Sequence, residues 1–146
     1  MRTFLVIVGM LATGCGTVGL VPSDTGAPTS TIEIDPYGQI DFGAHSINAA
    51  KSARMDITLF VQGESPVGIL DIVLDGSDAD LFVLPPELPL PMRLQPGIDF
   101  PLSLRFSPEE VGSFLGEFKV IIDDGTPDGA LIHRPIMGDG CEADGC

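Results

Sequence analysis

Residues 54–61 read Arg-Met-Asp-Ile-Thr-Leu-Phe-Val, an alternation that places every second apolar side chain on one face: Met55, Ile57, Leu59 and Val61. Successive side chains of a β-strand point to opposite faces of a sheet, so this period of two predicts a strand with one buried face. Gly63 ends the pattern. The same alternation returns in Phe100–Phe106, which predicts a second strand of the same kind.

Further segments on either side of this stretch have strand patterns and are separated by turn signals. They are Thr31–Asp35, Gln39–Gly43, Val67–Leu74, Leu81–Leu84, Phe114–Ile122 (broken at Gly116) and Ala130–Gly138. No window shows a sustained helical period, and the 18 glycines and 13 prolines suit a fold rich in turns. The sequence therefore predicts an all-β sandwich with Phe106 and Phe118 in its core.

Two proline-containing segments are predicted at sheet edges. Proline has no backbone N–H to donate to a strand ladder, so the cluster from Pro85 to Pro91 must lie at an edge or in a loop. Arg134 and Pro135 in the last segment are devices that protect an exposed edge. We therefore expect Ala130–Gly138 to be an edge strand.

Several spaced fragments together resemble the ASH or Hydin-type domain, which also occurs in bacterial envelope proteins called choice-of-anchor D. In chain order these are Ile40-Asp41-Phe42-Gly43, Ile57-Thr58-Leu59 with Gly63, Gly76-Ser77-Asp78-Ala79-Asp80-Leu81-Phe82, Leu94-Gln95-Pro96-Gly97, Phe106-Ser107-Pro108 with Gly112, Phe114 and Gly116, and Ile136-Met137-Gly138-Asp139-Gly140. The resemblance covers residues 32–140 and implies an immunoglobulin-like, seven-stranded antiparallel sandwich. Members of this family are mostly non-catalytic modules for assembly, adhesion or scaffolding, which implies an unknown protein partner.

The first 14 residues have the features of a secretory signal. Arg2 supplies a positive start, and the apolar run from Phe4 to Ala12 would form a helix of only ~14 Å, too short to span a bilayer core of ~30 Å. The segment Leu11-Ala12-Thr13-Gly14-Cys15 resembles the lipobox of bacterial lipoproteins. That resemblance implies cleavage before Cys15 and attachment of acyl chains such as palmitate to this residue; the alternative is an ordinary signal peptide followed by an incidental cysteine.

Composition and the following residues extend this interpretation. Residues 15–31 have no strand or helix period and are predicted to be a flexible linker from the membrane to the sandwich. Gly16 stands where Asp favours inner-membrane retention in enteric bacteria, so the expected location is the outer membrane of a bacterial cell envelope, with the periplasmic and outer faces both open. The net charge of −14 argues against nucleic acid as a partner.

Candidate catalytic and metal-binding residues are few, and we predict that the protein is not an enzyme and has no cofactor. The only histidines are His45 and His133, without any motif of a hydrolase or zinc site around them. Two acidic turns offer carboxylates to Ca²⁺: Asp75, Asp78 and Asp80, and Asp123, Asp124 and Asp128. Aspartate is also favoured in turns for local hydrogen bonding. A small calcium- or metal-dependent hydrolase using these turns is the alternative function.

Three cysteines are present, and assigning Cys15 to lipid leaves Cys141 and Cys146 as an even pair in the tail formed by residues 141–146. These two could form a disulfide beyond the last strand. Metal binding by the two thiolates is the alternative.

Overall fold

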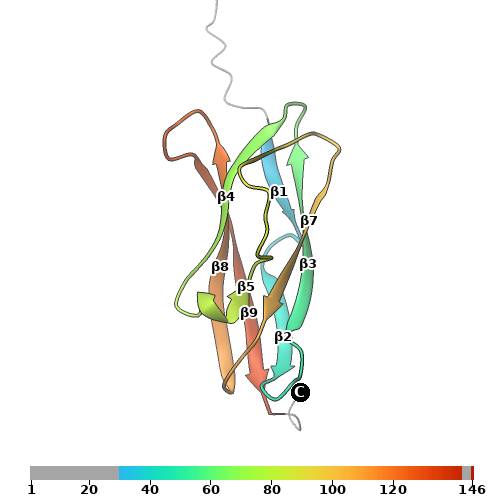
Figure 1. The fold of residues 1–146 in the computed structure, drawn as a ribbon, viewed down its shortest axis with the longest axis vertical. Coiled ribbons are helices and arrows are strands. Elements are labelled where there is room, and N and C mark those ends of the chain that lie inside the picture. The colour runs from blue at the N-terminus through green and yellow to red at the C-terminus, as the bar shows by residue number, and fades with distance from the viewer. Residues whose placement is uncertain (1–29, 143–145) are drawn as a thin grey trace, which may run out of the picture.

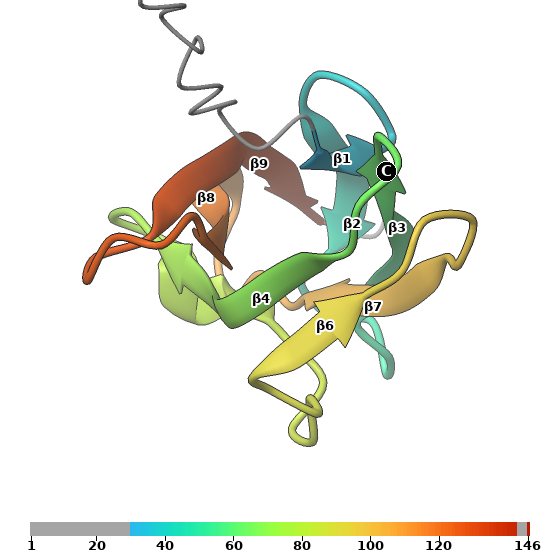
Figure 2. The same cartoon turned by 90° about the horizontal axis from the view of Figure 1, so that it is seen from above.

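The alternating segments pair into two sheets that face each other, as Figures 1 and 2 show for the computed structural model, which describes residues 30–142 and Cys146. The four-stranded sheet has the order β1 (Thr31–Asp35), β3 (Ala53–Gln62), β7 (Phe100–Phe106) and β5 (Phe82–Val83). The five-stranded sheet has the order β2 (Ile40–Ser46), β9 (Ala130–Cys141), β8 (Gly112–Asp123), β4 (Val67–Asp75) and β6 (Met92–Leu94). One short 3-10 helix, η1 (Ala79–Leu81), precedes β5. The predicted all-β sandwich is confirmed.

The core lies between the sheets and is centred on phenylalanine rings. Phe106 is completely buried, and its ring centroid lies 5.6 Å from that of Phe42, 5.0 Å from that of Phe82 and 6.1 Å from that of Phe114. These rings come from both sheets, so their contacts tie the two layers together. Phe118 is also fully buried, so the prediction of both core phenylalanines is confirmed.

Gly138 of β9 lies against the Phe106 ring. A Cβ atom at position 138 would be only 2.5 Å from Cε1 of Phe106, well inside van der Waals contact. Glycine is therefore the residue that lets the backbone of β9 approach the central ring.

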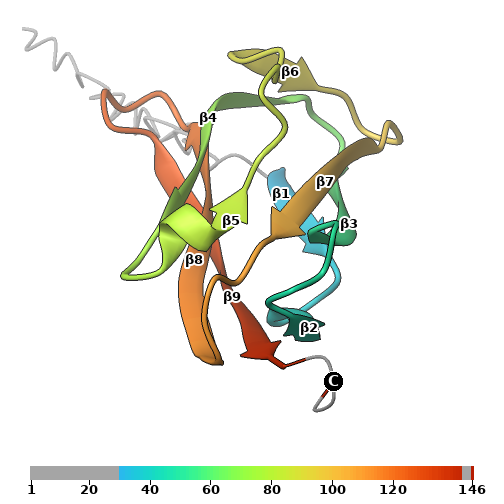
Figure 3. The same ribbon diagram turned by 60° about the horizontal axis from the view of Figure 1, so that its bottom comes forward.

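The described residues form nine strand segments instead of seven, because β5 and β6 are two short additions. The chain leaves the four-stranded sheet after β5 and reaches the edge of the five-stranded sheet at β6 (Figure 3). Between them, Leu84, Leu88 and Leu90 pack against the core. The prediction that the proline-rich segment lies at an edge or in a loop is confirmed, whereas β6 was not predicted.

One strand pair departs from the antiparallel arrangement. β2 pairs in parallel with β9, from Ile40 opposite Ile136 to Ser46 opposite Cys141. The register shifts between Asp41 and Ala44, where Gly43 has φ +64° and donates its N–H to Oδ1 of Asp41 at 2.8 Å. A positive φ costs glycine little, so this position suits a bulge.

The prediction of β9 as an edge strand was wrong, because β9 lies between β8 and β2. The pairing with β2 begins only at Ile136, so Arg134 and Pro135 lie in the half of β9 that has β8 as its one strand neighbour. Arg134 and Pro135 therefore do lie at a sheet edge, although the second half of β9 does not. Gly116 does not break β8; a Cβ there would lie 3.2 Å from the carbonyl oxygen of Asp75 on the adjacent strand.

Candidate binding groove

The outer face of the four-stranded sheet presents two arginines directly opposite each other. The register of β3 and β7 pairs Arg54 with Arg105 and Asp56 with Ser103. The alternate residues Ile57, Leu102 and Leu104 are buried, so by the period of two the arginines point outward into solvent. Like charges at directly opposed positions destabilise a sheet, so fold stability gives no reason for this pair.

Lys51 joins the two arginines from the loop before β3. The three side chains, called here the basic cluster, line one hollow together with Ala50 and Ser52. They are half of the six basic residues in the part of the chain that the structure describes. The protein has a net charge of −14, so this hollow differs from the acidic composition of the whole chain in gathering basic side chains.

The guanidinium groups of the cluster keep hydrogen-bond donors available. Arg54 donates from Nε to Oδ1 of Asp56 at 3.0 Å, and its side chain remains 62% exposed. The Ser103 hydroxyl donates to the same oxygen, and this bond, followed by that from Arg54, lowers the pKa of Asp56. Arg105 has no carboxylate oxygen within 4.0 Å among the described residues.

A second hollow continues from Arg105, and five of its seven lining residues are apolar. It is lined by Val83, Leu84, Pro85, Pro86, Pro101, Ser103 and Arg105. We call the two hollows together the groove, since Arg105 lines both. The side chain of Val83 is 47% exposed at its floor.

Along this groove, only a short part of the β7 edge is paired with another strand. β5 pairs with β7 at only two positions, Phe82 with Phe106 and Val83 with Arg105. Pro85 and Pro86 follow and cannot donate backbone hydrogen bonds, so the ladder ends there. Within the described part of the chain, the remainder of β7 therefore has a strand partner on the β3 side alone.

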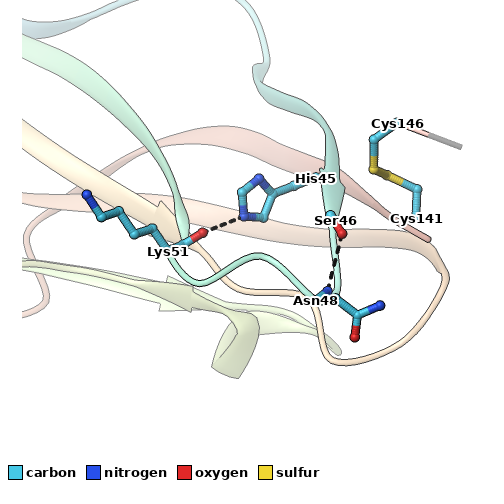
Figure 4. The surroundings of a disulfide bond; sticks show 6 residues. All are labelled: His45, Ser46, Asn48, Lys51, Cys141 and Cys146. Carbon is cyan, nitrogen blue, oxygen red and sulfur yellow. Dashed lines mark hydrogen bonds between the residues drawn. A yellow bond between two sulfur atoms is a disulfide. The ribbon is translucent and has the colours of Figure 1, made fainter. Parts of the chain in front are cut away.

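His45 braces the loop that carries Lys51. Its Nε2 lies 2.8 Å from the backbone carbonyl oxygen of Lys51 (Figure 4). In the same loop, Ile47 donates its N–H to the carbonyl oxygen of Cys141 at 3.0 Å. The imidazole is therefore a hydrogen-bonded structural group. The other histidine, His133, places Nδ1 3.9 Å from Oε1 of Glu117 on the adjacent strand.

The six aspartates of the two acidic turns lie in separate places, and four of them serve local structure. The turns are at opposite ends of β4, where Gly68 pairs with Asp123 and Asp75 pairs with Glu117. Among the residues that the structure describes, no group of three or more His, Cys, Asp or Glu side chains is placed to hold a metal ion. The structure therefore does not bring the six aspartates together as one cluster, and calcium binding stays a hypothesis.

Four of these aspartates have specific hydrogen-bond partners. Asp75 accepts from Nζ of Lys119 at 2.5 Å, which lowers the pKa of this aspartate and raises that of the lysine. Asp78 accepts from the Leu115 N–H at 2.9 Å. Asp123 accepts from the Gly125 N–H, while Asp124 accepts from the hydroxyl and N–H of Thr126, which lower the pKa of Asp124. Asp80 and Asp128 are exposed.

Cys141 and Cys146 are joined in a disulfide with Cα atoms 5.8 Å apart (Figure 4). The bond closes the tail at the end of β9, beside the loop that follows Ser46, because Ser46 pairs with Cys141. Cys15 lies outside the described residues, so its acylation stays a prediction. No helix within the described ranges has the length and apolar character needed to cross a bilayer.

The basic cluster was not predicted from the sequence. Each arginine occupies a polar position of an alternating segment, which gives its face. Their juxtaposition depends on the register between β3 and β7, which have 37 residues between them in the chain. A sequence pattern within one strand does not contain that information.

No protein-family model matches the sequence, and no curated protein matches it either. Among solved structures, a protein of unknown function from Porphyromonas gingivalis W83 has a TM-score of 0.57 at 16% identity, over 82% of this chain and 51% of that one. The VesB protease of Vibrio cholerae has a TM-score of 0.53 at 8% identity, and this chain spans 33% of its length. The ASH/PapD-like domain (PapD-like domain 7) of human CEP192 has a TM-score of 0.54 at 14% identity, over 98% of each chain. These likenesses show an immunoglobulin-like sandwich fold.

Proposed function

We propose that the protein is a lipoprotein of the bacterial cell envelope, anchored in the outer membrane through acyl chains on Cys15, whose sandwich domain binds a partner protein and is not catalytic. The segment Leu11–Cys15 supports the anchor, and the apolar run before it supports export. Two or more acyl chains on one residue give stable membrane attachment, whereas one chain gives marginal binding.

The groove is the observation that carries the binding role. It combines a partly uncovered strand edge, an apolar floor and a charged end, which are the features by which sheet edges recognise extended peptide segments. Pro101 of β7 has no N–H to donate, so a segment laid along β7 would gain fewer backbone hydrogen bonds than along a regular edge, and it would add side-chain contacts with Val83 and the prolines.

The position of the groove also suits an anchored protein. Ser30 is 4% exposed, and its Oγ accepts a hydrogen bond from the Ser65 N–H at 2.9 Å, which fixes the point where the chain enters the sandwich. Thr31 pairs with Gln62, and Arg54 stands eight residues earlier on the same strand, about 26 Å away at ~3.3 Å per residue. The basic cluster thus lies at the opposite end of the domain from the attachment point.

The anchor is tested by intact mass spectrometry of the native protein beside the Cys15→Ala variant. We expect the native protein to lack residues 1–14 and to carry acyl mass, which the variant lacks. An unmodified thiol at position 15 in the mature native protein would refute the lipid anchor.

The binding role is tested by site-specific photocrosslinking in living cells. Val83→benzoylphenylalanine places the probe in the groove, and Leu115→benzoylphenylalanine is the matched control, because Leu115 is similarly exposed at 57% on the other sheet. We expect one discrete crosslinked protein from position 83 and none from position 115. Equal products from both positions, or none from position 83, would contradict binding in the groove.

A further inference from the structure

We propose that the basic cluster recognises side-chain carboxylates of an extended acidic segment in the partner protein. This inference rests on the proposed function, since it names the chemistry of the segment that the groove would hold. The cluster consists of Lys51, Arg54 and Arg105, and Arg105 is shared with the apolar hollow.

The charges and donors of the cluster suit a carboxylate ligand. Arg54 and Arg105 face each other across two strands, and each guanidinium presents five N–H donors in a planar fork. Asp56 occupies the Nε side of Arg54. Arg105 has no carboxylate within 4.0 Å in the described part of the chain, so a partner carboxylate can accept its N–H groups in pairs.

The loop that supplies Lys51 is held before any ligand arrives. The hydrogen bond from His45 to the Lys51 carbonyl oxygen and that from Ile47 to Cys141 attach this loop to β2 and β9. A preformed site loses less conformational entropy on binding, so the loop need not be ordered by the ligand.

The surroundings of the cluster favour a narrow ligand over a broad anionic surface. Asp56 lies beside Arg54, and Glu109 lines the next hollow together with Lys51. A membrane or a nucleic acid would approach these carboxylates as well as the cluster, against a net charge of −14. An extended chain entering from the second hollow would pass Asp56, whose Oδ1 is already occupied by Arg54 and Ser103, and would reach Arg105 without covering Glu109. The cluster also faces away from the end where the chain enters the domain.

The test is peptide binding to the purified full chain in a non-ionic detergent, followed by calorimetry and by amide NMR shifts. The probe is an eight-residue peptide in which glutamate alternates with threonine, and its control replaces every glutamate with glutamine. We expect the Arg105→Gln variant to bind the glutamate peptide about tenfold more weakly, because a charge-assisted pair is lost. Arg93→Gln is the matched control: it removes the same charge from β6, outside the groove, and should change the affinity less than twofold.

Equal affinity for the glutamate and glutamine peptides, or equal losses in Arg105→Gln and Arg93→Gln, would overturn the inference. Binding of inorganic phosphate or of micelles containing phosphatidylglycerol through Arg105, without binding of the glutamate peptide, would assign the cluster to a phosphate or lipid ligand and would also overturn it. The crosslink from position 83 separates the two proposals. If it persists in an Arg105→Gln background, the groove binds a protein without needing this charge; if it never forms, the proposed function itself fails.

Discussion

Gly138→Ala should destabilise the sandwich from its centre. The new Cβ would lie 2.5 Å from Cε1 and 2.8 Å from Cδ1 and Cζ of Phe106, whereas carbon atoms in contact prefer about 3.5–4.0 Å. The ring must therefore move by about 1 Å. It has no free space to enter, because Phe106 is fully buried among three other phenylalanine rings. Overpacking of this kind costs about 1–3 kcal/mol in the free energy of unfolding.

The measurement is urea unfolding followed by far-ultraviolet circular dichroism, since the chain has no tryptophan to report fluorescence. We expect a lower midpoint with an unchanged slope, because the surface exposed on unfolding stays nearly the same. The Phe106→Leu background is the control: it removes the ring atoms that meet the new methyl group, so Gly138→Ala should cost much less there. A cost below about 0.5 kcal/mol in the native background, or an equal cost in both backgrounds, would refute the proposed contact.

Three further predictions concern charge. Arg105→Thr should raise the free energy of unfolding by about 0.2–1 kcal/mol, because it relieves the opposed arginines, and Arg93→Thr should not; urea unfolding of both variants checks this. Asp75 has a lowered pKa, so its ion pair with Lys119 contributes stability above the ordinary carboxyl value of 3.8 and loses it as the pH falls through the lowered value. The melting temperature should therefore decrease as the pH is lowered below about 4. In the Lys119→Met variant this decrease should be smaller, and a decrease equal to that of the native protein would count against a stabilising role of the ion pair. Millimolar Ca²⁺ should leave the melting temperature of the native protein unchanged, and a clear increase would support the calcium hypothesis.

Local alternation was sufficient to predict most of the fold. β1, β3, β7 and most of β8 lie where the period of two placed them, because each buries one face and exposes the other. β6 was missed because only three residues pair and a proline cluster precedes them. The position of β9 was wrong because its edge signals describe half a strand, while its second neighbour, β2, is distant in sequence.

The candidate site was less predictable than the fold, for a physical reason. The acidic turns are easily seen in the sequence as clusters of aspartate. In the structure, however, their carboxylates accept hydrogen bonds from backbone N–H groups and from Lys119. The basic cluster is not visible as a cluster in the sequence, because two strands and a loop bring its residues together. Registry between distant strands is set by the whole core and by the turns, so residues that meet through it are visible only once the fold is known.

If the proposed acyl anchor holds the protein on a membrane, the two prolines that follow β5 have a further consequence. Molecules confined to a membrane meet one another at high local density and in similar orientations, which favours pairing of open strand edges between neighbours. Pro85 and Pro86 cannot donate backbone hydrogen bonds, and they stand beside the uncovered part of β7. The edge of a second sandwich would therefore find few donors to pair with at this place, whereas a single chain could also contact the side chains of the second hollow. The same two residues would thus keep the proteins apart from one another and still leave the groove open to a partner.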